Sequence, residues 1–310
     1  MRETNLMPPA QPSGQLRWQS ALLVGAILPL CGGAVVGFAM RTRPAEARGQ
    51  IFAGVLISLA LAVAARLARS ATWPAAIAGG VLTADLVFMS IASGDGVWVH
   101  SPLLPLLTLF LLTLAATKFG RRRKEQLGVA EERRGRGASQ VVANLGAAGL
   151  TAALALSLSI TGDPSQTGDT YLSLRNLWPL MIAAVLAEAT ADTLSSELGE
   201  VLGGDPFLIT TGRRVSPGTD GAVSVAGSLA GCMGAAVIVL AAIPTLRLSL
   251  SLAFAAGASA IGGLFFDSIL GATLERSHWL NNDAVNFLST LAAALMAWGL
   301  FAWLHLSQPP

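Results

Sequence analysis

The chain has 310 residues, of which 53% are hydrophobic and only 12% are charged, and its formal net charge is +2. Soluble domains carry about 25% charged residues, so this chain, with a mean hydropathy of +0.61, has too little polar surface to remain in water. Composition therefore excludes a soluble globular enzyme and a disordered chain, and it indicates an integral membrane protein.

Apolar runs of membrane-spanning length follow one another along most of the chain. A bilayer core requires about 20 apolar residues per helix, and about nine runs approach this length, so seven to nine spans are expected. They lie near residues 20–40, 51–69, 73–91, 101–117, 138–160, 176–198, 222–244, 248–270 and 284–306. The sequence predicts an all-α polytopic transmembrane helix bundle. Residues 20–306 would form a single integral membrane domain between a polar tail over 1–19 and a short C-terminal tail over 307–310.

Two features of these runs bear on their packing. Small residues recur as Gly33-xxx-Gly37 and Gly227-xxx-Gly231, a spacing that allows helices to approach closely. The sixth and eighth runs contain acidic residues. Irregular backbone is tolerated in a membrane where it lines a cavity, so each of these runs is a candidate for a broken or re-entrant helix.

Basic residues concentrate in the loop over 118–137, which contains two lysines and six arginines. The positive-inside rule places this loop in the cytoplasm. Alternation of spans then places the loops near 209–224 and 271–283 on the same side. We expect a multi-pass protein of the inner (plasma) membrane whose motif-bearing loops face the cytoplasm. The loop with Arg41, Arg43 and Arg48 falls on the opposite side, against the rule.

The first polar stretch runs from the basic residues Arg133 and Arg134 into the fifth span. Arg136, Gln140 and Asn144 follow at a spacing of four residues, so they share one helix face. A basic, glycine-containing loop that enters a helix N-terminus is suited to anion binding. A cytoplasmic anchor is the alternative for the basic run, although Asn144 lies too far inside the span to serve as one.

The second polar stretch lies within the sixth span. Glu188 and Asp192 are one turn apart, and Ser195 and Ser196 continue their face. An acid within a span costs about 2.5–3.5 kcal/mol on insertion scales, so such residues normally face a cavity, a cation or a partner. Paired carboxylates are natural Mg²⁺ ligands in a phosphate-binding site. A proton or sodium site of a transporter and a structural ion pair remain alternatives.

The third polar stretch, over 208–224, combines glycines with hydroxyl and guanidinium groups. Its glycines allow backbone amides to approach an anion closely, and Pro217-Gly218 is typical of a turn. It is no P-loop, because the motif G-x-x-x-x-G-K-[ST] is absent from the sequence. The residues of interest are Thr210, Thr211, Gly212, Arg213, Arg214, Gly218 and Gly221. An ordinary connecting loop is the alternative.

The fourth polar stretch joins the last two spans. Gly263, Asp267 and Gly271 fall on one face of a helix, which suits close approach to a second helix or to a ligand. Asn282 and Asn286 are one turn apart at the start of the last span, where Asn282 or its neighbour Asp283 could instead cap the helix. All four stretches lie next to the predicted cytoplasmic face, where nucleotides and magnesium are available, and this grouping indicates phosphate chemistry.

These motifs resemble those of a family of membrane proteins formerly described as a domain of unknown function. The family contains plant plastid phytyl-phosphate kinase and vertebrate transmembrane protein 19. The resemblance covers most of the chain from about residue 75 onward and rests on the segments 117–120, 136–144, 191–199, 209–224, 267–272 and 282–286, which occur in the same order.

The resemblance implies transfer of a phosphoryl group from a nucleoside triphosphate, CTP, to phytyl phosphate or a similar polyprenyl monophosphate, with Mg²⁺ as cofactor. The isoprenoid tail would lie between apolar spans. On this basis the candidate catalytic residues are Asp192, Arg213, Arg214 and Asp267. The candidate metal ligands are Asp192, Glu197, Asp267 and Asp283. The candidate phosphate-binding residues are Lys118, Arg136, Asn144, Thr210, Thr211, Gly218, Asn282 and Asn286, in addition to the two arginines.

An ion-coupled transporter or lipid flippase is the main alternative, with Glu188, Asp192 and Asp267 forming an ion path. The sequence shows no internal repeat of the kind common in secondary transporters, which counts against it. A lipid-phosphate phosphatase or CDP-lipid transferase would use similar residues. Membrane lipids are expected partners, no nucleic-acid partner is expected, and the sequence leaves a homodimer open.

Overall fold

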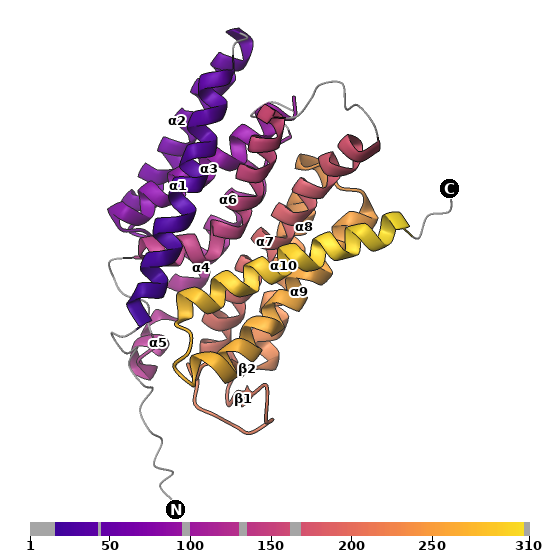
Figure 1. Cartoon of the computed structure of the whole chain (residues 1–310). Helices are drawn as coiled ribbons and strands as arrows, with labels where there is room; N and C mark the ends of the chain where they lie inside the picture. Colours follow the sequence, from indigo (N-terminus) through magenta and orange to yellow (C-terminus); the bar gives the residue numbers. More distant parts are fainter. Residues whose placement is uncertain (1–15, 43–44, 95–99, 130–134, 162–168, 307–310) are drawn as a thin grey trace, which may run out of the picture.

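A computed structural model describes residues 16–42, 45–94, 100–129, 135–161 and 169–306 (Figure 1). The chain is a bundle of α-helices with one short β-hairpin. Its helices are α1 Arg17–Arg41, α2 Ala45–Leu67, α3 Trp73–Ala92, α4 Leu103–Lys118, α5 Arg121–Leu127, α6 Ala138–Thr161, α7 Asp169–Leu202, α8 Val225–Thr245, α9 Leu250–Leu270 and α10 Asn282–Leu306. The hairpin consists of β1 Phe207–Leu208 and β2 Ala222–Val223, and a π-helical turn, η2 Gly271–Glu275, extends α9.

The predicted fold class is confirmed. Within the described residues, eight helices are long and apolar enough to cross a membrane, or up to nine if α4 and α5 form one bent span. The division into a membrane domain and two tails stays a prediction, because most of the N-terminal tail and all of the C-terminal tail lie outside the described residues.

The expected break in the sixth or eighth span occurs elsewhere. α7 is one helix of 34 residues in spite of Pro179, and α9 runs regularly into η2. The break lies between α4 and α5, whose axes differ by 60°. Gly120 at this corner has φ +61°, and a Cβ there would lie 2.6 Å from the Val201 side chain. Glycine therefore permits both the turn and the close packing of the corner on α7.

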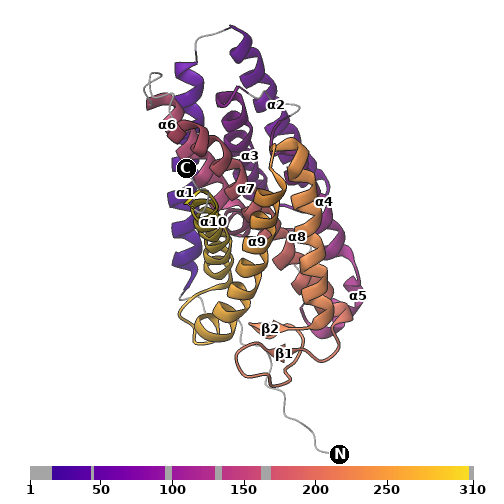
Figure 2. The same cartoon turned by 90° about the vertical axis from the view of Figure 1, so that its right-hand side faces the viewer.

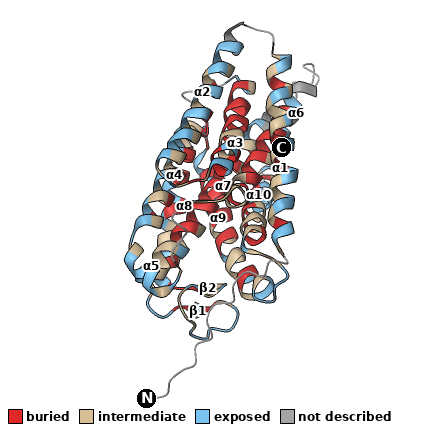
Figure 3. Cartoon of the chain, turned by 90° about the vertical axis from the view of Figure 1, so that its left-hand side faces the viewer, coloured by how far each residue is buried: buried red, intermediate tan, exposed pale blue. Residues whose placement is uncertain are grey.

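α7 forms the centre of the bundle. In its most apolar stretch 78% of residues are buried, against 17% in α1 and 11% in α2. α7 packs on α4, α6, α8, α9 and α10, whereas α1 and α2 pack mainly on α3 and α6. Figure 3 shows the buried residues concentrated around this centre and the exposed ones on the outer helix faces. Glu188 and Asp192 of α7 therefore lie in the interior, away from lipid.

The two small-residue motifs behave differently. A Cβ on Gly227 would lie 2.6 Å from the Ser195 carbonyl oxygen, and one on Gly231 would lie 2.8 Å from that of Ala191. α7 and α8 are thus in backbone contact, as the spacing predicts. Gly33 and Gly37 have no atom within 4 Å of an added Cβ. The contact expected there is not made within the described part of the chain, because α1 packs through the opposite face, with Ile27, Cys31 and Phe38 buried.

One end of the bundle collects most of the polar segments. α5, the hairpin, the ends of α7 and η2, and the starts of α6, α8 and α10 lie together at the lower end in Figures 1 and 2. These are the segments that carry the motifs described above.

Candidate functional site

A polar cavity of about 410 Å³ opens at this end of the bundle. It is bounded by the first turns of α6 and α10, the last turns of α7 and α9 with η2, and the segment that leads into β2. The polar side chains that line it are Arg136, Gln140, Asn144, Asp192, Thr193, Ser195, Ser196, Glu197, Glu200, Thr219, Asp220, Ser224, Asp267, Ser268, Glu275, Asn282 and Asn286.

Carboxylates from two helices meet in this cavity. Asp192 of α7 and Asp267 of α9 both line it, and Oδ1 of Asp267 is buried without a hydrogen-bond partner among the described residues. Glu188 lies one turn deeper on α7 and is completely buried. Its carboxylate interacts with Ser289 of α10 but makes no hydrogen bond of ordinary geometry within the described residues. A Cβ on Gly263 would lie 2.6 Å from Cγ of Glu188. Only glycine therefore leaves room for this acid between α7 and α9.

Arg136 is held in the cavity wall by its own backbone. Its N–H donates to the Ser70 carbonyl at 2.9 Å, and its carbonyl accepts from the Thr72 N–H at 3.0 Å. The preceding Gly135 has φ +79°, and a Cβ there would lie 2.5 Å from the Ser70 carbonyl carbon. Arg136 interacts electrostatically with Asp192 across the cavity. The entry of α6 is therefore fixed by the segment that joins α2 to α3.

Amide side chains complete this wall. Oε1 of Gln140 accepts a hydrogen bond from the Gly137 N–H at 2.7 Å, and Nδ2 of Asn286 donates to Oδ1 of Asn144 at 3.3 Å. Gln140 and Asn144, one turn apart on α6, both line the cavity, so the helix face predicted for them is turned toward it. Arg136 lines the cavity too, but it precedes α6, so it does not share that helix face as the spacing predicted. Asn144 and Asn286 connect α6 to α10 at the cavity wall.

A buried ion pair fixes the bent helix to α7. Nζ of Lys124, which is only 1% exposed, contacts Oε2 of Glu197 and donates to the Ala116 carbonyl at 2.8 Å. Oε1 of Glu197 accepts from the Thr117 hydroxyl at 2.8 Å. Both oxygens of Glu197 are thus engaged by α4 and α5.

The hairpin separates into a packed base and an exposed tip. β1 and β2 pair antiparallel, with Phe207 opposite Val223. At the base, Gly221 has φ +71°, and a Cβ there would lie 2.2 Å from the Ala272 nitrogen, so the loop packs directly on η2. The exposed tip is the turn over 209–214. At its end, Arg214 folds back beside β1 and forms an ion pair with Asp205 at 2.9 Å in which both side chains are more than 70% exposed.

The structure brings together eight of the candidate catalytic, metal-binding and phosphate-binding residues. Those that line the polar cavity are Arg136, Asn144, Asp192, Glu197, Gly218, Asp267, Asn282 and Asn286. Four others lie on the exposed tip of the hairpin, away from the cavity: Thr210, Thr211, Arg213 and Arg214. Lys118 lines a neighbouring apolar groove instead. The basic residues Arg133 and Arg134 lie outside the described residues.

Asp283 is engaged at the start of α10. Oδ2 of Asp283 accepts a hydrogen bond from the Ser20 hydroxyl of α1. The sequence offered Asp283 or Asn282 as the cap of this helix, but neither residue caps it. Oδ1 of Asn281 accepts from the Ala284 N–H at 2.9 Å, so Asn281 is the cap. Nδ2 of Asn281 also donates to the Leu16 carbonyl at 2.9 Å, which joins this loop to the start of α1.

Four ionisable residues at this site were missed as candidates. Glu200, Asp220 and Glu275 line the cavity, and Lys124 is buried beside it. Glu200 and Glu275 could have been found from their positions after acid-bearing spans, and Asp220 from its position in the third polar stretch. Lys124 offered no such signal, because it stands in a run of arginines typical of a solvated loop. Asp85 of α3, also missed, is fully buried but lines neither cavity.

The carboxylates fit a magnesium site of a particular kind. No group of three or more His, Cys, Asp or Glu side chains that could hold a metal ion occurs in the described residues. Mg²⁺ is usually bound through one or two carboxylates, with substrate phosphates and water as the other ligands. Asp192 and Asp267, with the unpartnered Oδ1 of Asp267, match this pattern. Glu197 and Asp283 are bonded to other side chains.

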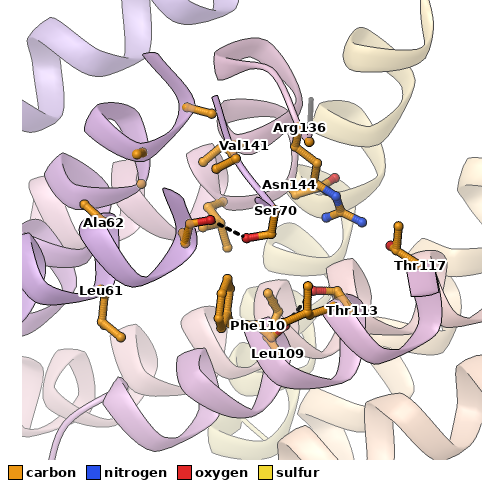
Figure 4. A pocket seen from close by; sticks show the side chains of 18 of the residues that line it. Leu61, Ala62, Ser70, Leu109, Phe110, Thr113, Thr117, Arg136, Val141 and Asn144 are labelled. Carbon is orange, nitrogen blue, oxygen red and sulfur yellow. Dashed lines mark hydrogen bonds between the residues drawn. The ribbon is translucent and has the colours of Figure 1, made fainter. Parts of the chain in front are cut away.

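An apolar groove of about 180 Å³ lies beside the polar cavity, between α2, α3, α4 and α6 (Figure 4). Arg136 and Asn144 line both spaces. The carboxylate- and amide-lined cavity and the apolar groove are therefore neighbours, and among the described residues they share Arg136 and Asn144 in their walls.

Comparison with known proteins gives the family. The model of the family Integral membrane protein DUF92 matches residues 56–294. The chain belongs to this family of integral membrane proteins. This result confirms the resemblance inferred from the motifs and the assignment as a multi-pass membrane protein.

Its relatives come from bacteria, archaea and plants. The chain is 35% identical over 214 residues to the uncharacterized membrane protein sll0875 of Synechocystis sp., which covers 64% of this chain and 73% of the relative. It is 40% identical over 111 residues to the uncharacterized membrane protein MJ0933 of Methanocaldococcus jannaschii, covering 36% and 46%. It is 35% identical over 194 residues to Protein VTE6, chloroplastic, of Arabidopsis thaliana, covering 61% and 55%. No solved structure matches the chain.

Proposed function

We propose that this protein is an isoprenyl-phosphate kinase. It transfers the γ-phosphoryl group of a nucleoside triphosphate, CTP, to phytyl phosphate or a similar polyprenyl monophosphate. One observation carries the proposal: the polar cavity with Asp192 and Asp267 adjoins an apolar groove, and Arg136 and Asn144 line both. A lipid phosphate needs this combination, because its tail requires apolar walls and its head must reach the phosphate chemistry. The motif resemblance to a family that contains plant phytyl-phosphate kinase supports the same substrate class.

The reaction requires positioning and charge neutralisation more than acid–base catalysis. An oxygen of the acceptor phosphate attacks the γ-phosphorus, and the bond between that phosphorus and the β–γ bridging oxygen breaks. The electron pair of this bond leaves with the nucleoside diphosphate. The second pKa of a phosphate monoester is about 6, so the acceptor is already largely ionised at neutral pH. The cavity therefore needs no general base.

The residues of the cavity divide into two groups. Asp192 and Asp267 would hold Mg²⁺, which would neutralise charge on the phosphate oxygens. The guanidinium of Arg136 would bind phosphate oxygens by paired, charge-assisted hydrogen bonds. Asn144 and Asn286, already bonded to each other, would orient the same oxygens. The exposed Arg213 and Arg214 have no part in this arrangement.

We propose that the cavity faces the cytoplasm and that the protein resides in the inner (plasma) membrane. The basic residues that follow α4 lie at the same end of the bundle as the cavity (Figure 1), and basic loops favour the cytoplasmic side. Nucleoside triphosphates are available on that side.

The test uses the full chain in nanodiscs with Mg²⁺. Each nucleoside triphosphate would be supplied in turn with phytyl, geranylgeranyl or farnesyl monophosphate, and diphosphate products would be measured by mass spectrometry. We expect diphosphate with one donor and its loss in Asp192→Asn and Asp267→Asn. The matched control is Asp205→Asn, since this exposed aspartate lies outside the cavity. Absence of diphosphate with every pair, in folded wild-type protein, would refute the proposal.

Ion-coupled transport is the second candidate, and Glu188 is the observation that favours it. This buried acid continues the row of Asp192 and Asp267 toward the middle of the bundle. Beyond it, however, residues 182–187 of α7 are all apolar and 0% exposed, so no polar side chain continues the row along this part of the helix. Proton or sodium flux in liposomes, abolished by Glu188→Gln and independent of nucleotide, would favour transport over the kinase.

A further inference from the structure

The apolar groove is built by four helices and ends in a basic mouth. Its walls come from Leu61 and Ala62 of α2, Gly79 of α3, Phe110 of α4 and Val141 of α6. Figure 4 shows Leu61 and Phe110 facing the space across from Val141. α2 packs mainly on α3, whereas α4 packs mainly on α7 and α8. The groove occupies the space between the pair α2 and α3 on one side and α4 on the other.

Cationic side chains gather at one end of the groove. Lys118 ends α4, Arg121 begins α5, Arg69 follows α2, and Arg136 precedes α6; all four line the same space. Arg121 also pairs with Glu125 at 3.1 Å. Arginine forks match phosphate oxygens in geometry, and lysine adds a point charge. A ligand with an apolar chain and an anionic head is complementary to this distribution.

The mouth of the groove adjoins the polar cavity. Arg136 and Asn144 line both spaces, and Thr117, which lines the groove, binds Glu197, which lines the cavity. An anionic head held at Arg136 would therefore stand at the boundary with the chamber that contains Asp192 and Asp267. A nucleotide is the less suitable occupant of the groove itself, because its walls beyond the mouth are mostly aliphatic.

We propose that this groove binds the isoprenoid chain of the acceptor lipid, with its phosphate at Lys118, Arg121 and Arg136. The proposal rests on the proposed function in one respect, that the ligand is a lipid monophosphate. It adds which helices hold the chain and from which side the phosphate enters the polar cavity. The nucleotide phosphates would then approach Arg136 from the opposite side, between Asp192, Asp267 and the base of the hairpin.

Gly79 provides a way to block the groove. It lies seven residues along α3 from Thr72, whose backbone is bonded to Arg136, so it is about 10 Å deeper than the mouth. The nearest atom to an added Cβ is Cγ1 of Val141 at 3.8 Å, an ordinary contact. Gly79→Leu therefore places a side chain into the space without a backbone clash. A five-carbon isoprenyl chain is too short to reach this depth, whereas a twenty-carbon chain passes it.

A matched control is available on α9. Gly257 is a half-buried glycine within a membrane helix, and the nearest atom to an added Cβ is Cγ2 of Val239 at 3.9 Å. It lines neither the groove nor the polar cavity. Gly257→Leu therefore makes the same change in volume and backbone propensity at a site remote from the groove.

The experiment measures binding separately from transfer. The full chain in nanodiscs would be photolabelled with geranylgeranyl monophosphate that carries a diazirine on its chain, and labelled peptides would be mapped by mass spectrometry. We expect label on α2, α3, α4 and α6. Loss of two buried CH₂ contacts corresponds to about a tenfold decrease, so labelling should fall about tenfold in Gly79→Leu. It should be unchanged in Gly257→Leu.

Three further results decide between explanations. Competition by unlabelled geranylgeranyl monophosphate but not by geranylgeraniol supports phosphate binding at the basic mouth, and Lys118→Ala should weaken that difference.

Label confined to other helices, or equal labelling of Gly79→Leu and wild type, would overturn the proposal that the groove binds the chain. Label in the groove without diphosphate from any nucleotide would support the groove and refute the kinase. In active protein, Gly79→Leu should raise KM for the twenty-carbon acceptor about tenfold and leave isopentenyl monophosphate unaffected.

Discussion

Two arginine-bearing segments, the start of α6 and the tip of the hairpin, contrast with each other in this protein. Both combine arginine with glycine and polar side chains, so in the sequence each is a candidate anion site. Arg136 lines both the polar cavity and the apolar groove. Arg213 and Arg214, in contrast, lie exposed on a loop whose backbone hydrogen bonds join residues close together in the chain. The difference lies in what holds the backbone.

The backbone of Arg136 is bonded to Ser70 and Thr72, residues more than sixty positions away in the chain. The tip of the hairpin is closed by local bonds, such as that from the Leu208 N–H to the Arg213 carbonyl at 2.8 Å. A side chain that binds a transition state must be held in place before the substrate arrives. Anchoring by distant segments supplies that positioning, and a local turn does not.

Replacement of Arg136 should have the largest effect. Removal of one preorganised group that stabilises transition-state charge costs about 10²–10³ in rate. We expect Arg136→Ala to lower kcat/KM for the lipid monophosphate by this factor, and Arg136→Lys to recover only part of it, because lysine lacks the fork. Steady-state kinetics in nanodiscs measure both. Equal losses in Arg136→Ala and Arg213→Ala would contradict the contrast drawn above.

Replacement of Gly135 tests the anchor without touching the arginine. Gly135→Ala should lower activity about ten- to a hundredfold, because its Cβ would meet the Ser70 backbone at 2.5 Å and move Arg136 by a fraction of an ångström to an ångström. Gly128 is the control. It also has a positive φ, +74°, but an added Cβ meets nothing within 4 Å.

Both alanine variants carry the backbone cost of a left-handed residue, about 1–2 kcal/mol. When activity is expressed per folded protein, only Gly135→Ala should remain less active than wild type. Comparable activities of the two variants at equal folded fraction would show that the position of Arg136 does not depend on this contact.

The Lys124–Glu197 pair should affect stability more than catalysis. Glu197→Gln leaves the buried ammonium of Lys124 without its counter-charge, which we expect to cost about 3 kcal/mol in the free energy of unfolding. Thermal unfolding in detergent measures this loss, and Lys124→Met combined with Glu197→Gln should recover part of it. The Mg²⁺ concentration for half-maximal activity should stay unchanged in Glu197→Gln, whereas Asp192→Asn should be inactive at every Mg²⁺ concentration. A rise of this concentration in Glu197→Gln would make Glu197 a metal ligand, as the sequence suggested.

Changes at the hairpin tip should have the smallest effect. The Arg214–Asp205 pair is exposed on both sides, and exposed pairs contribute about 0–1 kcal/mol. We expect Arg213→Ala and Arg214→Ala to change both the equilibrium constant of unfolding and kcat/KM by less than about twofold. A loss above tenfold would mean that the tip closes over the cavity during the reaction.

The fold was largely accessible from the sequence because each span is a continuous apolar run. The predicted span near 138–160, for example, differs by one residue from α6. The bend at Gly120 was not accessible. The corner packs closely on α7 beside Val201, 81 residues later in the chain, and a short-range pattern cannot report such packing.

The site was accessible where helix spacing alone decides orientation, as for Gln140 and Asn144. Arg136 also lines the cavity, but it precedes α6 and is placed by its bonds to Ser70 and Thr72. The role of a carboxylate was not accessible where a side chain from a distant part of the chain already binds it. Glu197 has the sequence context of a metal ligand but is bonded to Lys124 and Thr117. Asp283 similarly contacts Ser20 of α1. Their partners lie more than seventy residues away, and one of them, Lys124, stands within a basic run that resembles a solvated loop.

The length of α4 has a consequence for the surrounding bilayer. With 16 residues, this helix is about 24 Å long, whereas the hydrocarbon core is about 30 Å thick. Hydrophobic mismatch of this kind is relieved by thinning of the adjacent lipid. The headgroup layer is then drawn inward beside Lys118, at the mouth of the groove. A lipid in this thinned rim would already have its phosphate near the depth of the basic side chains, so that lateral diffusion, without extraction from the membrane, would deliver it.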